Sequence, residues 1–173
     1  MLPSGKRTRV ASVESFDKPL EEAFPPQSVT IRLEDDVDVG RGDMLVDPDR
    51  APFVARELTA EICWMTERAL EPRARLAVKH TTRASRAIVD ELVSVVDMHT
   101  LEHVSSPERL ALNDLADVRL RLSDSLVVDP YERNRATGSF ILIDEATNET
   151  VAAGVILDTE VEERDEPPSE WCA

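Results

Sequence analysis

The segment between residues 139 and 156 is the feature that most restricts how this chain can fold. Ser139 to Asp144 reads SFILID, an apolar run rich in aromatic and β-branched residues, and Thr150 to Ile156 reads TVAAGVI. The polar residues between them include Asn148, which tolerates a left-handed backbone. Two strand-like runs joined by a loop of about five residues predict a β-hairpin.

Further strand signals occupy most of the chain before this hairpin. The run 53–65 contains good helix formers, so a helix is an open alternative, but the alternation of Leu58, Ala60, Ile62 and Trp64 favours a strand. The alternation within 85–96 changes phase, which predicts a β-bulge. Strands are expected at 7–16, 28–33, 44–46, 53–65, 74–80, 85–96, 117–122 and 126–128. Short strands at regular spacing, without a helix of ordinary length, predict an all-β sandwich or a pair of barrels.

Three segments are expected to interrupt these strands. Residues 47–52, DPDRAP, contain two prolines and predict an interdomain linker. Residues 97–108 are polar and predict a loop. From Asp158 onward acidic residues greatly outnumber basic ones, so 158–173 is expected to be a disordered, solvated tail.

The formal net charge of −15 at pH 7 restricts the possible partners. It would repel a nucleic-acid backbone and an anionic membrane surface, so neither is expected to bind. Cys63 and Cys172 are the only cysteines, which predicts no disulfide framework and favours a reducing cytoplasm. No apolar run reaches the roughly 18 residues of a membrane span, and no signal peptide is visible. We therefore expect a soluble cytoplasmic protein.

No catalytic, cofactor-binding or metal-binding residue is predicted from the residues themselves. Neither GxxxxGK[ST] nor GxGxxG occurs, so a phosphate-binding loop is not expected. His99 and His103 would converge on a metal only on a helix, and a loop is favoured there. The acids Asp35, Asp36, Asp38 and Asp43 lack the ordered spacing of a calcium loop. These observations favour a β-rich interaction module.

A resemblance to a known family extends over about residues 2–156. The fragments DPY (129–131), NR (134–135), TGSFILID (137–144), TN (147–148) and TVAAG (150–154) resemble the C-terminal signature of the GTP-binding large subunit of bacterial sulfate adenylyltransferase. That subunit belongs to the elongation-factor-Tu-like GTPases. Matches in the same order occur at LPSG (2–5), EEAF (21–24), RGDML (41–45), TLEH (100–103) and LN (112–113).

The resemblance implies two barrels of the translation-factor type. Residues 1–47 would form part of a second-domain barrel and 48–157 a complete barrel like the third domain of elongation factor Tu, with the acidic tail expected from composition, 158–173, following them. The GTPase domain that carries the P-loop in the family has no counterpart here. The leading hypothesis is accordingly a C-terminal piece of the large subunit, from a truncated or split gene or a misassigned start.

The family activates sulfate: ATP and sulfate give adenylyl sulfate and pyrophosphate on a separate small subunit, driven by GTP hydrolysis in the large one. By this resemblance the present chain alone would be inactive, and GTP and Mg²⁺ would belong to the missing GTPase domain. The implied partners are that domain, or a chain carrying it, and the small catalytic subunit. Asn134, Arg135 and Thr137 are the predicted interface residues; alternatively, they only shape the loop before the hairpin. A stand-alone β-barrel binding module and a functionless gene remnant are the alternatives to the leading hypothesis.

Overall fold

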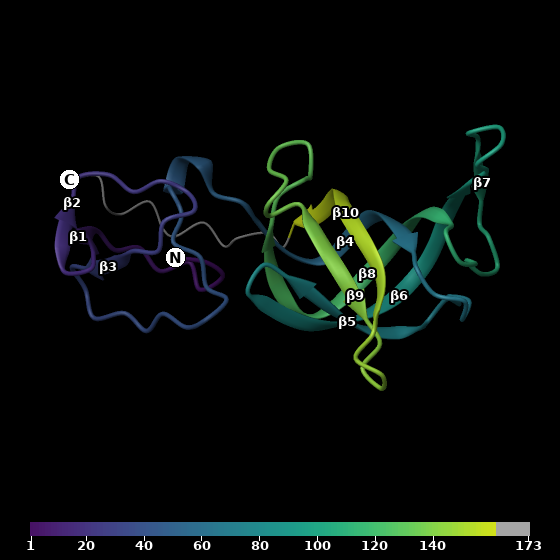
Figure 1. Cartoon of the computed structure of the whole chain (residues 1–173), viewed down its shortest axis with the longest axis horizontal. Helices are drawn as coiled ribbons and strands as arrows, with labels where there is room; N and C mark the ends of the chain where they lie inside the picture. Colours follow the sequence, from purple (N-terminus) through teal and green to yellow (C-terminus); the bar gives the residue numbers. More distant parts are fainter. Residues whose placement is uncertain (162–173) are drawn as a thin grey trace.

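The computed structural model describes residues 1–161, which form an all-β structure with one short 3-10 helix (Figure 1). No helix in this range has the length and apolarity that a membrane crossing requires. The all-β prediction is confirmed. The elements are β1 (Val10–Ser15), β2 (Lys18–Leu20), β3 (Thr30–Leu33), η1 (Pro48–Arg50), β4 (Phe53–Trp64), β5 (Arg75–His80), β6 (Arg83–Val96), β7 (His103–Ser105), β8 (Leu115–Val128), β9 (Ser139–Ile143) and β10 (Thr150–Val161).

Six strands close into a barrel in the order β5-β9-β10-β4-β8-β6, because β6 also pairs with β5. All of these pairings are antiparallel. Closure pairs the backbone groups that an open sheet would leave exposed at its edges. The predicted hairpin is the β9–β10 pair, with Thr150 opposite Ile143 and Asn148 in the left-handed conformation (φ 59°).

The barrel interior is filled by the alternating apolar residues of its strands. On β4, the residues Leu58, Ala60, Ile62 and Trp64 are each no more than 3% exposed, so the strand prediction for 53–65 is confirmed. Burying each large apolar side chain contributes about 1.5–3 kcal/mol. The inward-facing residues of β8 complete this core with Ala116, Val118, Leu120 and Leu122.

The bulge predicted within residues 85–96 is confirmed. Where β6 pairs with β8, the register shifts between Val89 and Glu91 and again between Leu92 and Ser94. Val89 faces the core before the first shift, Leu92 faces it between the two shifts, and Val95 packs against the core after the second. Continued alternation would have placed Glu91 on the inner face with Val89, but Glu91 is exposed. The bulge therefore keeps this carboxylate in water.

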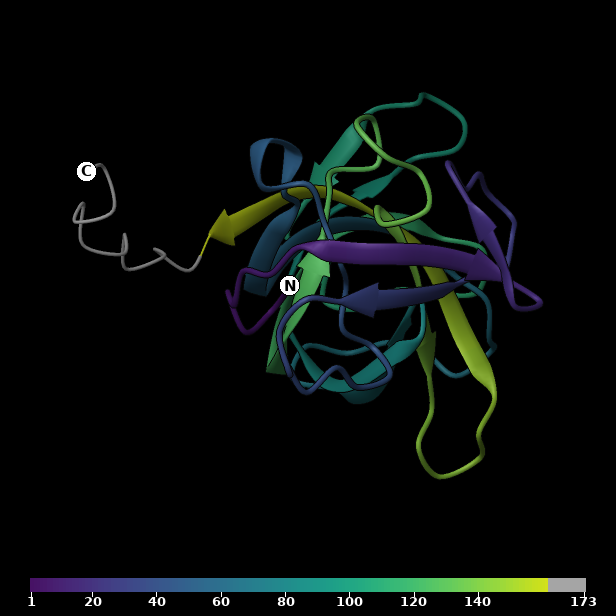
Figure 2. The ribbon, with the colours of Figure 1, turned by 90° about the vertical axis from the view of Figure 1, so that its left-hand side faces the viewer.

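A second sheet, of order β2-β1-β3, is formed near the N-terminus (Figure 2). None of its residues is buried, although Val13 lies opposite both Leu20 and Ile31. The strand predicted at 44–46 was wrong: Met44 forms only an isolated bridge with Leu2, through two backbone hydrogen bonds of 2.9 and 3.0 Å. This part of the chain has strand pairing without a core of its own.

Two further boundaries differ from the sequence predictions. The polar segment 97–108 contains β7, which pairs with the end of β6. The residues Asp158–Val161 were expected to be disordered but continue β10 and pair with β4, because β4 extends far enough to offer them backbone partners. The rest of the predicted tail, residues 162–173, lies outside the described residues.

Candidate interface site

The loop between β8 and β9, residues 129–138, carries the three predicted interface residues. Thr137 fastens this loop from within: its Oγ1 donates a 2.7 Å hydrogen bond to Oδ2 of the buried Asp129, and its carbonyl accepts from the Asp129 N–H at 3.2 Å. The same carbonyl lies 2.8 Å from Nε2 of His80, at the end of β5. His80 is only 1% exposed, and its burial lowers its pKa, against the opposing effects of the Thr137 hydrogen bond and the Asp129 charge.

Asn134 also acts within the loop. Its Oδ1 accepts a 3.1 Å hydrogen bond from the Ala136 N–H, and its own N–H donates to the Pro130 carbonyl at 3.1 Å. The loop then folds so tightly over Gly138 that a Cβ there would lie 2.7 Å from both the Asn134 carbonyl oxygen and the Tyr131 nitrogen. Asn134 and Thr137 shape the loop through these contacts, and the interface role predicted for them stays a prediction.

Arg135 differs from the other two because its side chain lines a concavity on the barrel surface, whereas Asn134 and Thr137 do not. Its guanidinium carbon is 5.7 Å from the centroid of the Tyr131 ring, a distance typical of a cation–π contact. Its carbonyl accepts a 2.9 Å hydrogen bond from Ser139 Oγ. Both Arg135 and Tyr131 line a shallow concavity on the outside of the barrel. Arg135 thus borders this concavity, and the interface role predicted for it stays a prediction.

The concavity lies on the outer wall formed by β4, β10 and β9 and has a volume of about 770 Å³. Its outward-facing apolar residues, which we call the apolar wall, are Cys63, Leu115, Ile141, Ala153 and Val155. Charged residues Glu61, Lys79 and Arg135 stand around it. Contiguous apolar surface with a polar rim is typical of protein-binding sites.

The opposite wall of the barrel has a different chemistry. Across the ring, β6 and β8 present charged side chains that are paired with one another: Arg119 with Glu91 at 3.0 Å, and Arg121 with Asp90 at 2.7 Å. Arg73 adds a second contact to Asp90 at 2.9 Å. Charged side chains that are already paired with each other and hydrated contribute little free energy to binding a partner. The apolar wall is therefore the better candidate interface.

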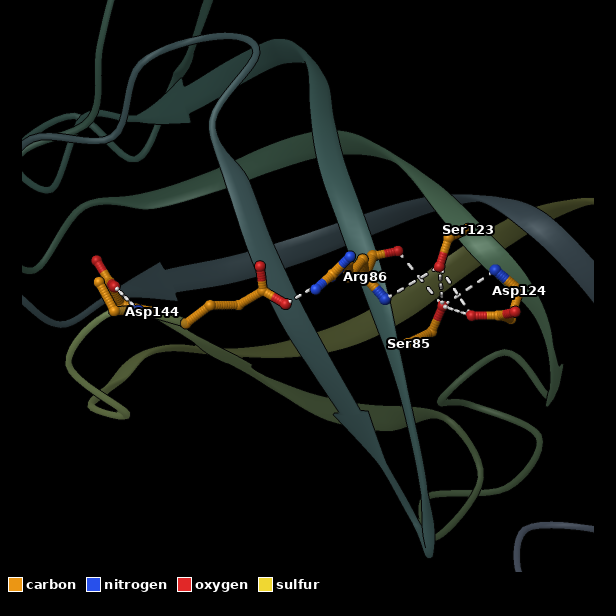
Figure 3. A network of polar contacts seen from close by, with 7 residues as sticks. Ser85, Arg86, Ser123, Asp124 and Asp144 are labelled. Carbon is orange, nitrogen blue, oxygen red and sulfur yellow. Dashed lines mark hydrogen bonds and ion pairs between the residues drawn. The ribbon is translucent and has the colours of Figure 1, made fainter.

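A cluster of hydroxyls and one carboxylate joins β6 to β8 (Figure 3). Asp124 Oδ2 accepts hydrogen bonds from Ser123 Oγ at 2.8 Å and Ser85 Oγ at 3.2 Å, and these lower the pKa of the carboxyl. The Arg86 N–H donates to Ser123 Oγ, while its side chain reaches Glu145 in the β9–β10 loop at 2.8 Å. These hydrogen bonds join Ser85 and Arg86 of β6 to Ser123 and Asp124 of β8, so the cluster braces this side of the barrel.

A second cluster, which sequence reasoning missed, contains Ser94, His103 and Asp117. Ser94 Oγ donates to Asp117 Oδ2 at 2.7 Å and lies 3.1 Å from His103 Nδ1, which is itself 3.4 Å from Asp117. A catalytic triad needs serine and aspartate on opposite ring nitrogens, but here both meet Nδ1. The cluster instead ties β7 to β6 and β8. His99 lies in the turn before β7, so its four-residue spacing from His103 does not place both on one helical face.

Comparisons with known proteins agree on one family. Residues 57–157 match the family described as GTP-eEF1A C-terminal domain-like. The chain is 47% identical over 164 residues, 95% of its length, to a protein named sulfate adenylyltransferase subunit 1 from Bacteroides fragilis. It is 46% identical over 91% of its length to the bifunctional enzyme CysN/CysC of Mycobacterium tuberculosis. It spans only 34% and 26% of these two relatives.

A solved structure shows the same fold at low sequence identity. The crystal structure of sup35 complexed with GDP superposes with a TM-score of 0.80 over 92% of this chain and 39% of the sup35 chain, at 18% identity. A likeness at this identity concerns the arrangement of strands alone. It places both the small N-terminal sheet and the barrel within an architecture that occurs in a larger protein.

Proposed function

This chain belongs to the GTP-eEF1A C-terminal domain-like family, and on that premise we propose that it is the C-terminal β-barrel portion of the GTP-binding subunit of a sulfate adenylyltransferase. The observation that carries the proposal is the 47% identity over 164 residues to sulfate adenylyltransferase subunit 1. The activity proposed for the complete assembly is the conversion of ATP and sulfate to adenylyl sulfate and pyrophosphate. The chain spans about a third of that relative, so it would contribute one part of the assembly.

The proposed role of this part is support. GTP and Mg²⁺ would bind on the GTPase portion, which this chain would hold through the apolar wall of β4, β9 and β10. Ala153 and Val155 present small apolar side chains there, and Arg135 and Lys79 stand at the border. Such a surface can pack closely against another folded domain, with the two cations available for its acidic groups.

The small N-terminal sheet supports a role in a larger assembly over a stand-alone barrel module. Its strands β1, β2 and β3 bury no side chain, and Val10 and Phe16 are 54% and 96% exposed. A sheet needs a covering layer before its apolar residues can contribute to stability. A partner that supplies further strands to this sheet would give it that layer.

We further propose that the assembly includes the small catalytic subunit and works in the cytoplasm. The name of the relative, subunit 1, implies at least one other kind of subunit. Within residues 1–161 the thiol of Cys63 forms no disulfide, which suits a reducing compartment.

Co-expression tests the proposal. The full chain is produced together with the portion of the Bacteroides fragilis relative that it does not match, and complex formation is followed by size-exclusion chromatography. We expect a complex that forms adenylyl sulfate in a GTP-dependent reaction when the small subunit is added. Failure to form any complex at micromolar concentrations would overturn the proposal.

A matched pair of substitutions locates the interface. Ala153→Arg places a large cation on the apolar wall and should weaken the complex at least about tenfold, because it blocks close packing. Ala111→Arg makes the same change at another exposed alanine, in the turn before β8, and should leave binding unchanged. Equal binding by both variants would exclude the apolar wall as the interface.

A further inference from the structure

The end of the molecule remote from β1–β3 carries a projecting hairpin that the proposed function does not use (Figure 1). We define the finger as residues 95–105, the end of β6, the following turn and β7. Three large apolar side chains on it are exposed: Met98 by 60%, Leu101 by 70% and Val104 by 52%. Val104 lies opposite Val95, which packs against the barrel core, so an apolar surface continues from the core onto the finger.

The turn of the finger is organised by its own hydrogen bonds. The Asp97 N–H donates to the Glu102 carbonyl at 2.9 Å, and the Leu101 N–H donates to the Asp97 carbonyl at 2.7 Å. Asp97 Oδ1 accepts from the backbone of His99 at 2.8 Å and of Thr100 at 3.3 Å. The exposed apolar residues are therefore carried on an ordered turn.

A leucine at position 101 lowers the stability of this turn relative to glycine or asparagine. Its φ of 59° is left-handed, a conformation that costs about 1–2 kcal/mol for a residue with a Cβ and that glycine or asparagine would adopt more easily. Its side chain, 70% exposed, also gains little from burial among the described residues. A strained residue with an exposed apolar side chain is the pattern expected of a binding contact.

The base of the finger is fastened to the barrel. Ser94 contacts His103 at 3.1 Å and Asp117 at 2.7 Å, and the Ser106 N–H donates to the Val93 carbonyl at 2.9 Å. These bonds join β7 to β6 and β8. A surface held in its binding conformation loses less entropy when a partner docks.

The charges around the finger restrict its partner. Asp97, Glu102 and Glu108 stand against Arg109 and two histidines, in a chain of net charge −15. A second copy of the chain, or an anionic membrane, would bring like charges together. A protein cleft with an apolar floor and lysine or arginine at its border would complement both the apolar side chains and the acids.

We propose that the finger docks a second protein subunit by inserting Leu101 and Met98 into an apolar cleft bordered by basic residues. This inference rests on the proposed function, in which the GTPase portion is held by the apolar wall elsewhere on the barrel. The finger lies at the far end from the N-terminal sheet, so a partner that completes that sheet leaves the finger free (Figure 1).

The test uses the complex of the full chain with the GTPase portion and takes the purified small subunit of sulfate adenylyltransferase as the probe. Leu101→Gly removes the side chain and suits the left-handed backbone, so its melting temperature should equal or exceed that of the wild type. Its affinity for the small subunit, measured by titration calorimetry, should fall about tenfold or more. Leu157→Ser removes an exposed leucine of β10, outside both the finger and the apolar wall, and should change affinity little.

Each alternative has its own outcome. Wild-type affinity of Leu101→Gly for the small subunit would overturn the proposal, as would absence of small-subunit binding to the wild-type complex. Leu101-dependent self-association, or Leu101-dependent binding to phosphatidylcholine–phosphatidylserine vesicles, would replace the proposed partner with a second copy or a membrane. Absence of small-subunit binding to the wild-type complex would also count against the proposed assembly with that subunit. The other results leave the complex with the GTPase portion unaffected, and that complex separately tests the proposed function.

Discussion

Gly138 is the residue at which the β8–β9 loop leaves no room for a side chain. A Cβ there would collide with backbone atoms of Tyr131 and Asn134, which cannot rotate away. We expect Gly138→Ala to lower the free energy of unfolding by about 1–3 kcal/mol, the range found for overpacked sites. Urea denaturation measures this change.

The control for that substitution is Gly40→Ala. The nearest atom to a Cβ at Gly40 is Asp43 Oδ2 at 3.7 Å, an ordinary contact. This variant should unfold at nearly the wild-type urea concentration. Equal effects of the two substitutions would show that the loop around Gly138 is more open than described.

The buried His80 is expected to make the folded protein less stable in mild acid. Burial lowers its pKa from the ordinary 6.5, so in the folded state it stays neutral at a pH where the unfolded chain already takes up a proton. As the pH falls below about 6.5, proton uptake therefore favours unfolding, until the folded-state pKa is passed. The melting temperature should decrease through this window.

A glutamine at position 80 provides the comparison. His80→Gln keeps a donor within reach of the Thr137 carbonyl but cannot titrate. Its melting temperature should depend less on pH between about pH 7 and about pH 5 than that of the wild type. Parallel pH profiles for both proteins would assign the acid sensitivity to other groups.

At the scale of elements, the β1–β3 sheet and the barrel should differ in local stability. In the described part of the chain, β2 and β3 are sheet edges and the sheet buries no side chain, whereas β4 and β8 lie within a closed ring around the core. We expect the amides of β1–β3 to exchange with solvent faster than those of β4 and β8. Hydrogen–deuterium exchange followed by mass spectrometry measures this, and uniform protection would contradict it.

Strand type was predictable from sequence, while strand ends were not. Alternation in 53–65 and the phase change in 85–96 are local, and both predictions are confirmed by β4 and by the bulge in β6. The end of β10 depends on Ala55–Thr59 of β4 as partners for Val161–Asp158, about a hundred residues earlier in sequence. Local acidity predicted disorder there, and long-range pairing outweighed it.

At the scale of the whole molecule, GTP alone should not stabilise the chain. A ligand raises the melting temperature only if it binds the folded state, and the 173 residues contain no P-loop sequence. Thermal unfolding with millimolar GTP and Mg²⁺ should therefore match unfolding without them. The complex with the GTPase portion should shift upward under the same conditions, and a clear shift of the chain alone would place a nucleotide site on these residues.

The sequence by itself determined the strands, the all-β class and the resemblance to the large subunit of sulfate adenylyltransferase, which the relatives confirm. Hydrophobic alternation, turn residues and sequence matches to a family are all local features of the sequence. Only the tertiary structure decided that Asn134 and Thr137 turn into their own loop while Arg135 faces an apolar wall. Closure of the barrel through β5 and β6 also brings Ser94, His103 and Asp117 together at the base of a finger. Such groupings follow from pairings between distant strands, which no local pattern specifies.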